Sequence, residues 1–206
     1  GLTNTWYNNF STRFNGQYDW LRFFGHLYLT SEEKRNLQPQ HRYLVTVESD
    51  YFRFSFGDNF PRFNNLILDG KRVRGFTGRL SYGIVNVETA IGETERSIEG
   101  ELIETFSRTA APLASDVVAI DSLVYGDPFG RIKFGTYKRN LFALRPYLKS
   151  GESFMFGLTY LHSKDDINSI NFSARPKENL VIGTDLSLGF DDQRIMFNSQ
   201  AAFSLM

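Results

Sequence analysis

Cysteine is absent from the 206-residue chain, so neither a disulfide bond nor thiolate chemistry can contribute to its fold or function. No run of about eighteen apolar residues occurs, so we expect no transmembrane helix. Neither sign of charge is in excess, because 23 Lys and Arg residues balance 23 Asp and Glu residues. The sequence therefore lacks the basic surplus that favours nucleic acid, and we expect no nucleic-acid partner.

Sequence motifs of catalysis and metal binding are also missing. The three histidines, His26, His41 and His162, are far apart and do not have the spacing of metal ligands. The chain contains no G-x-S-x-G, no P-loop and no HExxH motif. We therefore predict a protein that is not an enzyme, with no catalytic residue, no metal site and no cofactor.

Aromatic residues, in contrast, are abundant at 16% of the chain, with 20 Phe and 10 Tyr. The stretch from Leu180 to Phe203 alternates apolar and polar residues on both sides of Asp191-Asp192. Folding it at that turn pairs Leu188 with Ile195 on an apolar face and leaves the opposite face largely polar. Such a period of two predicts a β-hairpin with two different faces.

Four further stretches give the same result. They lie at 10–29, 42–57, 75–92 and 140–160, and we place their turns at Asp19-Trp20, Ser49-Asp50, Gly83-Ile84 and Lys149–Gly151. At Asp19-Trp20 the apolar pattern overrides the nearby Asn15-Gly16 turn signal, because register follows the buried face. The predicted pairs that define the four registers are Phe14 with Gly25, Val47 with Phe52, Tyr82 with Val85, and Pro146 with Phe154.

The connections between these hairpins are longer and more polar than the turns within them. They cover residues 31–40, 57–74, 96–130 and 164–178. Tight turns at one end and long loops at the other are typical of an up-and-down sheet. We therefore predict an all-β fold, an antiparallel meander of about ten strands in a single domain over 1–206. The segment 96–130 is its longest loop.

Alternation alone does not tell which face meets water. A lipocalin-like barrel or a sandwich keeps its apolar face inside, whereas an outer-membrane barrel turns it toward lipid. Four features favour lipid outside: strands near eleven residues, tight turns at one end with long loops at the other, a polar face with more Arg, Asn and Ser than Lys, and aromatics near strand ends. These aromatics are Tyr18, Trp20, Tyr82 and Tyr160. The alternative is a soluble all-β ligand-binding module.

Three stretches carry a resemblance to bacterial outer-membrane β-barrels. GDNFPRFNNLILDGKRVRGF is similar to segments of large export-system barrels, such as chaperone–usher pores and the type IX secretion translocon. RNLFALRPYLKSGESFMFGLTY and PKENLVIGTDLSLGFDDQRI resemble barrels of this general kind. The resemblance implies a transmembrane β-barrel, or part of one, in the outer membrane of a Gram-negative bacterium. It would act as a pore, a transport or export component, or a membrane anchor.

The same resemblance implies the surroundings of the chain. Outer-membrane lipid would contact the apolar face, and further strands of the same chain or barrel would complete the wall. The loop 96–130 would lie on the extracellular side.

The polar face would line the lumen of such a barrel, and arginine predominates there. A wall of this kind would favour anionic solutes, unless its side chains interlock and fill a narrow barrel. The predicted lumen-lining residues are Arg13, Arg22, His26, Arg42, Arg53, Arg79, Glu88, Arg145, Asp185, Asn198 and Gln200. Near the long loops we predict rim charge pairs that join Arg72 and Arg74 to Glu95 and Glu93.

Overall fold

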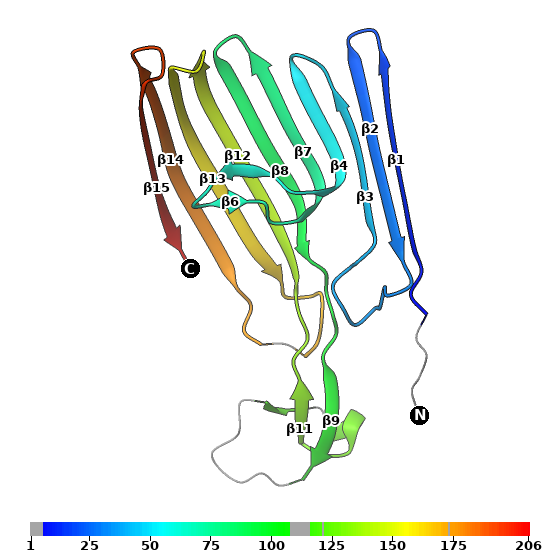
Figure 1. Ribbon diagram of the computed structural model, residues 1–206. Helices are drawn as coiled ribbons and strands as arrows, with labels where there is room; N and C mark the ends of the chain where they lie inside the picture. Colours follow the sequence, from blue (N-terminus) through cyan, green and yellow to red (C-terminus); the bar gives the residue numbers. More distant parts are fainter. Residues whose placement is uncertain (1–5, 108–115, 121, 173) are drawn as a thin grey trace.

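Ten antiparallel strands form one sheet in the computed structural model, which describes residues 6–107, 116–120, 122–172 and 174–206 (Figure 1). The strands are β1 (Asn9–Tyr18), β2 (Leu21–Thr30), β3 (Arg42–Glu48), β4 (Phe52–Asn59), β7 (Val73–Tyr82), β8 (Val85–Glu95), β12 (Lys138–Ser150), β13 (Phe154–Asp166), β14 (Glu178–Phe190) and β15 (Ile195–Leu205). They pair in chain order from β1 to β15, so the predicted antiparallel meander is confirmed. The sheet is open, with β1 and β15 at opposite edges, and it does not close into a barrel.

Two smaller β-structures lie in the long connections. An inner hairpin, residues 60–72, contains β5 (Arg62–Asn64) and β6 (Leu68–Asp69). The predicted loop 96–130 instead contains β9 (Glu101–Phe106), β10 (Val117–Ala119), the short helix α1 (Ser122–Tyr125) and the start of β11 (Phe129–Lys133). These three strands form a separate sheet beyond the loop end of the main sheet (Figure 1). Residues 108–115 and 121 of this segment lie outside the described residues. Among the described residues, no helix is long and apolar enough to cross a membrane.

Two of the five predicted registers are confirmed. The first hairpin turns at Asp19-Trp20 and pairs Phe14 with Gly25. Asp19 adopts a positive φ of 53°, which Asp tolerates better than most residues. The ring of Phe14 lies over Gly25, where a Cβ would come within 1.9 Å of it, so the aromatic ring covers the exposed backbone. The hairpin at Gly83-Ile84 pairs Tyr82 with Val85, as predicted.

The other three predicted registers are wrong by an even number of residues. Val47 pairs with Phe54 rather than Phe52, because Asp50 and Tyr51 form the tip once Ser49 N donates to Phe52 O (2.8 Å). Leu188 pairs with Phe197, not Ile195. In the third, the loop is 151–153 instead of 149–151, and Phe154 pairs with Ser150. The first two shifts are of two positions and the third is of four, and because each is even, every residue stays on its predicted face.

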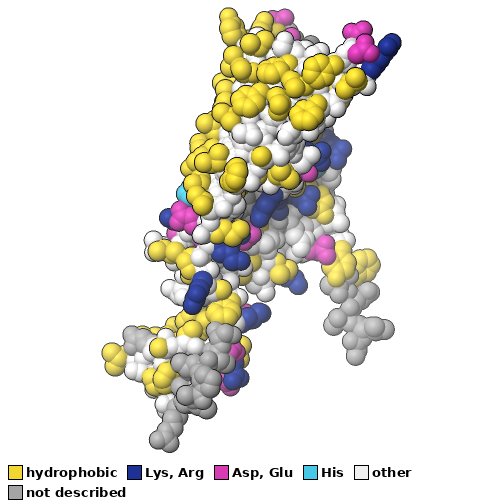
Figure 2. Space-filling view, turned by 90° about the vertical axis from the view of Figure 1, so that its left-hand side faces the viewer, with side chains coloured by type: hydrophobic (Ala, Val, Ile, Leu, Met, Phe, Trp, Pro, Cys, Tyr) yellow, Lys and Arg dark blue, Asp and Glu magenta, His cyan; other side chains and the backbone are white. Residues whose placement is uncertain are grey.

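The main sheet therefore has one apolar and one polar face. The outer face carries one apolar row per strand, such as Phe10, Phe14, Leu27 and Leu29 on β1 and β2, and these side chains are largely exposed. The inner face carries most of the charged and polar side chains. Figure 2 looks from the side of β15 and shows hydrophobic side chains over one flank and the turn end, with Lys and Arg on the opposite flank and below.

The buried core lies on the inner face, where the inner hairpin crosses the sheet (Figure 1). Phe63 and Leu68 of the hairpin pack against Val73, Ala90, Leu141, Ala143, Leu161 and Val181 of β7 to β14. Ile67 sits above Gly183, where a Cβ would come within 2.4 Å of its Cδ1 atom. Small residues on the wall thus make room for the hairpin. The expectation that residues 57–74 form a long polar loop is wrong, because Phe63, Ile67 and Leu68 pack against the sheet and are removed from water.

Candidate functional site

A single row of charged side chains crosses the inner face from β2 to β12. The register places each member directly opposite the next, in the order Arg22, Glu48, Arg53, Arg79, Glu88 and Arg145. We call these six residues the charged row. Opposite charges at facing positions stabilise a sheet, and like charges destabilise it. The signs alternate along the row except at one place, where Arg53 faces Arg79.

At its β12 end the charged row is buried. Arg145 Nη2 lies 2.6 Å from Asp185 Oδ2, and Arg145 Nη1 lies 3.0 Å from Glu88 Oε2. The Arg145 side chain is only 8% exposed and that of Asp185 3%. Asp185 crosses over β13 because Gly157 has no side chain; a Cβ there would lie 2.7 Å from Asp185 Oδ1. Tyr147 completes the site, with its ring centre 4.6 Å from the Arg145 guanidinium.

At its β2 end the charged row is open. Glu48 is shared by two arginines, at 3.1 Å from Arg22 and 3.2 Å from Arg53, and both arginine side chains are about half exposed. Arg79 is exposed, and its guanidinium group makes no ion pair or hydrogen bond with a side chain of the described residues. Its cross-strand neighbour Glu88 points to Arg145 instead. Within the Arg53–Arg79 step, Arg53 is therefore paired with Glu48 and Arg79 is left without a carboxylate.

A cavity of about 310 Å³ lies beside this step, between the sheet and the inner hairpin. From the sheet it is lined by charged and hydroxyl side chains, and from the hairpin by aromatic and basic ones. The wall residues include Thr46, Arg53, Ser55, Thr77, Arg79 and Glu88, and the hairpin residues are Phe60, Pro61, Arg62 and Phe63. We call this space the hairpin cavity. Its size is at the lower end of the range for small-molecule sites.

Near the long loops the predicted rim charges have other partners. Arg74 faces Glu93 in the register, as predicted, but both Arg74 and Arg72 bind Asp58, at 2.9 and 2.7 Å from its Oδ1 atom. Arg72 does not pair with Glu95, which instead binds Arg139 (2.9 Å) and Lys71 (3.5 Å). Both arginines bind Asp58 rather than the glutamates because Asp58 is nearly fully buried, where an unpaired charge is costly. Asp58 also accepts a hydrogen bond from the Tyr43 amide (2.9 Å).

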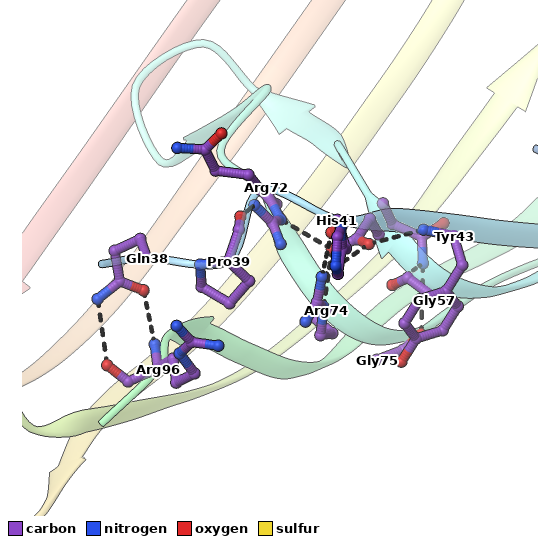
Figure 3. A network of polar contacts seen from close by, with 12 residues as sticks. Gln38, Pro39, His41, Tyr43, Gly57, Arg72, Arg74, Gly75 and Arg96 are labelled. Carbon is purple, nitrogen blue, oxygen red and sulfur yellow. Dashed lines mark hydrogen bonds and ion pairs between the residues drawn. The ribbon is translucent and has the colours of Figure 1, made fainter. Parts of the chain in front are cut away.

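Asp58 and Asp165 anchor the loop end, and the sequence pattern did not single them out for that role. Arg72 also donates to the Pro39 carbonyl oxygen and Arg74 to that of His41 (2.6 Å), which ties the β2–β3 loop to β7 (Figure 3). Asp165 is equally buried and accepts from Arg139 Nε (2.7 Å) and the Lys177 amide (2.8 Å). Both carboxylates bring together segments that are far apart in the chain, which a strand pattern does not reveal.

A third anchor holds the β2–β3 loop to the end of β8. Gln38 and Arg96 exchange two hydrogen bonds through backbone and amide atoms, at 2.8 and 3.1 Å (Figure 3). Arg96 also binds Glu33 Oε1 at 3.1 Å. Burial acts to raise the pKa of Glu33, but hydrogen bonds from the His41 and Gln40 amides and from Arg96 outweigh it and hold the pKa below its usual value.

The remaining predicted lumen-lining residues also lie on the inner face. Arg13 pairs with His26, as the register predicted, and Gln200 pairs with Asp185. His26 Nε2 lies 3.4 Å from Ser11 Oγ, with no carboxylate bound to the ring among the described residues. The other two are Arg42, whose guanidinium lies 5.8 Å from the Phe60 ring centre, and Asn198. The structure brings together the charged row and Asp185, whereas these five residues are spread over the two edges of the sheet.

Within the described residues no group of three or more His, Cys, Asp or Glu side chains is placed to hold a metal ion. Comparisons with protein-family models, with curated proteins and with solved structures find no match for this chain. Its functional reading therefore depends on its own two faces, the charged row and the hairpin cavity.

Proposed function

We propose that the chain forms the wall, or part of the wall, of a bacterial outer-membrane β-barrel. The observation that carries this proposal is the outer face. Phe14, Phe56 and Ile182 lie far apart across the sheet, and each is more than half exposed. Soluble monomers rarely expose an apolar surface that spans a whole sheet. Lipid would cover this face without any partner protein.

Strand length and turn chemistry support the same proposal. Eight of the ten main strands have 10 to 13 residues, and only β3 and β4 are shorter. A tilted transmembrane strand needs about 9 to 11 residues. Tyr18, Trp20 and Tyr82 are exposed at the tight turns, where an interfacial aromatic girdle would lie.

The open edges and the inner hairpin suggest the role of the wall. The outer edges of β1 and β15 have no paired strand among the described residues, and further strands of the same chain or barrel would complete the hydrogen bonding there. The inner hairpin covers part of the inner face, so a solute would pass beside it. We infer a non-enzymatic pore, transport or export component, or membrane anchor, with the 96–130 segment outside the cell.

Heat-modifiable gel mobility of the refolded chain tests the membrane setting. We expect a fast-migrating folded form in detergent and no folded monomer in plain buffer. A chain that is folded and monomeric in buffer would contradict the proposal and favour a soluble ligand-binding module. If the chain folds in neither medium, the test is repeated with a longer chain that supplies the strands next to β1 and β15.

An arginine placed on the outer face tests the same point by its depth dependence. Leu144 at the middle of β12 and Phe154 beside the turn at the start of β13 lie on the same face and are almost equally exposed, at 36% and 37%. In lipid, Leu144→Arg should cost roughly 2–4 kcal/mol of unfolding free energy, and Phe154→Arg distinctly less. Urea unfolding in vesicles measures both. Equal costs at 144 and 154 would show that exposure, not membrane depth, sets the penalty.

A further inference from the structure

The charged row contains one repeated sign, and this repeat is the starting point. Arg53 and Arg79 are directly opposite on β4 and β7. Facing residues of antiparallel strands have Cα atoms only about 4.5–5.5 Å apart. Like charges at facing positions of a sheet destabilise the pair unless an anion lies between them.

The neighbouring carboxylates do not resolve this repulsion. Glu88 lies 3.0 Å from Arg145, and Glu48 divides its two oxygens between Arg22 and Arg53. Arg79 is left with no acidic partner among the described residues, although it faces Glu88 in the register. Arg22 also lies 3.5 Å from Asp50, so the carboxylates of the row are bound to Arg22, Arg53 and Arg145, and the Arg79 guanidinium is the one without a carboxylate beside it.

The Arg53–Arg79 pair lies beside a cavity that could hold a small ligand. Arg53 and Arg79 both line the hairpin cavity, and Arg62 lines it from the inner hairpin. The hydroxyls of Thr46 and Ser55, 2.8 Å apart, lie on the same wall. Phe60, Pro61 and Phe63 provide apolar surface on the hairpin side, which strengthens hydrogen bonds to charged groups by excluding water.

We propose that Arg53 and Arg79 bind the oxyanion group of a small solute in the hairpin cavity, with Arg62 as a third contact. A guanidinium group donates two parallel hydrogen bonds to a phosphate, sulfate or carboxylate, so one such group satisfies both arginines. The cavity admits a small molecule and not a folded chain. The site lies on the polar face, so it goes beyond the membrane proposal and holds whichever way the outer face is covered.

Calorimetric titration of the folded full chain tests the site. The buffer contains an uncharged maltoside detergent and is free of phosphate, sulfate and carboxylates; inorganic phosphate, sulfate and citrate are the three probes. We expect saturable binding of at least one probe to the wild type. Arg79→Gln should weaken it at least about tenfold, because a hydrogen bond to a charged group is lost. Arg79→Lys, which keeps the charge without the planar fork, should lie between the two.

Arg194→Gln is the matched control. Arg194 is also an exposed arginine, but it lies between β14 and β15 in the 191–194 turn and pairs with Asp191 (3.5 Å). We expect this variant to bind like the wild type. Equal loss in Arg79→Gln and Arg194→Gln would overturn the proposal, since net charge alone would then explain the signal. Absence of saturable binding to the wild type by all three probes would also overturn it.

Unfolding without ligand gives a second readout that separates this site from the membrane proposal. In low salt and without the probes, Arg79→Gln should raise the unfolding midpoint, because it removes the repulsion with Arg53. The bound probe should raise the midpoint of the wild type and not that of the variant. A variant that is less stable than the wild type in both conditions would overturn the proposal. Neither result depends on whether the chain folds in detergent or in buffer.

Discussion

On the β8 to β14 side of the sheet the inner hairpin packs on the inner face, whereas on the β1 to β4 side the same face is open except where the hairpin cavity lies. Arginine serves both halves. Arg145 is 8% exposed between Glu88 and Asp185, and Arg22 is 48% exposed beside Glu48. Their ion-pair distances are similar, at 3.0 and 3.1 Å to a glutamate. Distance alone therefore does not rank the two pairs, and burial decides what each contributes.

Removing one arginine from each half should give the largest difference in unfolding free energy between the two halves. Arg145→Met leaves the buried Asp185 and the partly buried Glu88 without their cation, which should cost about 3–5 kcal/mol of unfolding free energy. Arg22→Met removes a solvent-exposed pair and should cost at most about 1 kcal/mol. Urea unfolding under one set of folding conditions measures both variants. Similar costs would mean that Arg145 is not shielded from water.

The inner hairpin itself offers a second pair of variants with matched chemistry. Leu68 is 3% exposed against the sheet, and Leu66, two residues earlier, is 60% exposed. Leu68→Ala should cost about 2–5 kcal/mol of unfolding free energy, because it leaves a cavity beside Ala143 and Leu161. Leu66→Ala should change it by less than about 0.5 kcal/mol. Faster hydrogen exchange at the β12 and β13 amides in Leu68→Ala alone would show that the cover has loosened.

The two halves also differ in how well the sequence predicted them. In the open half, the turn at Asp19-Trp20 and the Arg13–His26 pair follow from alternation alone. A period of two fixes which face a residue takes, and that prediction holds in all five hairpins. It does not distinguish registers that differ by two, because Val47 finds an aromatic partner at Phe52 or at Phe54. Backbone hydrogen bonds at the turns, such as that from Ser49 N to Phe52 O (2.8 Å), select between these registers.

In the covered half the sequence pattern was less informative. The inner hairpin has too few residues per strand to show a period, so Phe63 and Leu68 were assigned to a polar loop. The partners of Arg145 were also hidden. Its bond to Asp185 (2.6 Å) passes over a whole strand, and only the glycine at position 157 permits it. Likewise, Arg72 and Arg74 were matched to glutamates by register, whereas the buried Asp58 attracts both.

Glu33 gives the smallest expected effect and lies between the two halves in burial, with its side chain 21% exposed. Because the pKa of Glu33 is lowered in the folded chain, its contribution is present above the usual carboxylate pKa of roughly 4.3 and is lost as pH falls through the lower folded value. The amides of Gln40 and His41 donate to Glu33 Oε2 at 2.6 and 3.0 Å. Their hydrogen-exchange protection factors, corrected for the intrinsic pH dependence, should therefore fall in that acidic range.

Glu33→Gln is the control for this effect, since its amide oxygen still accepts a hydrogen bond but carries no charge. The hydrogen-exchange protection factors of the Gln40 and His41 amides should be lower than in the wild type at neutral pH. They should also no longer fall as the pH is lowered. The Tyr43 amide, which donates to the nearly fully buried Asp58, should keep its protection in this variant. Loss of protection at all three amides would mean that the β2–β3 loop opens as one unit. A local loss of one carboxylate affects only the amides that bind it. An effect of Glu33→Gln on the Tyr43 amide, which binds Asp58, would therefore mean that the Glu33 and Asp58 anchors open in a single equilibrium.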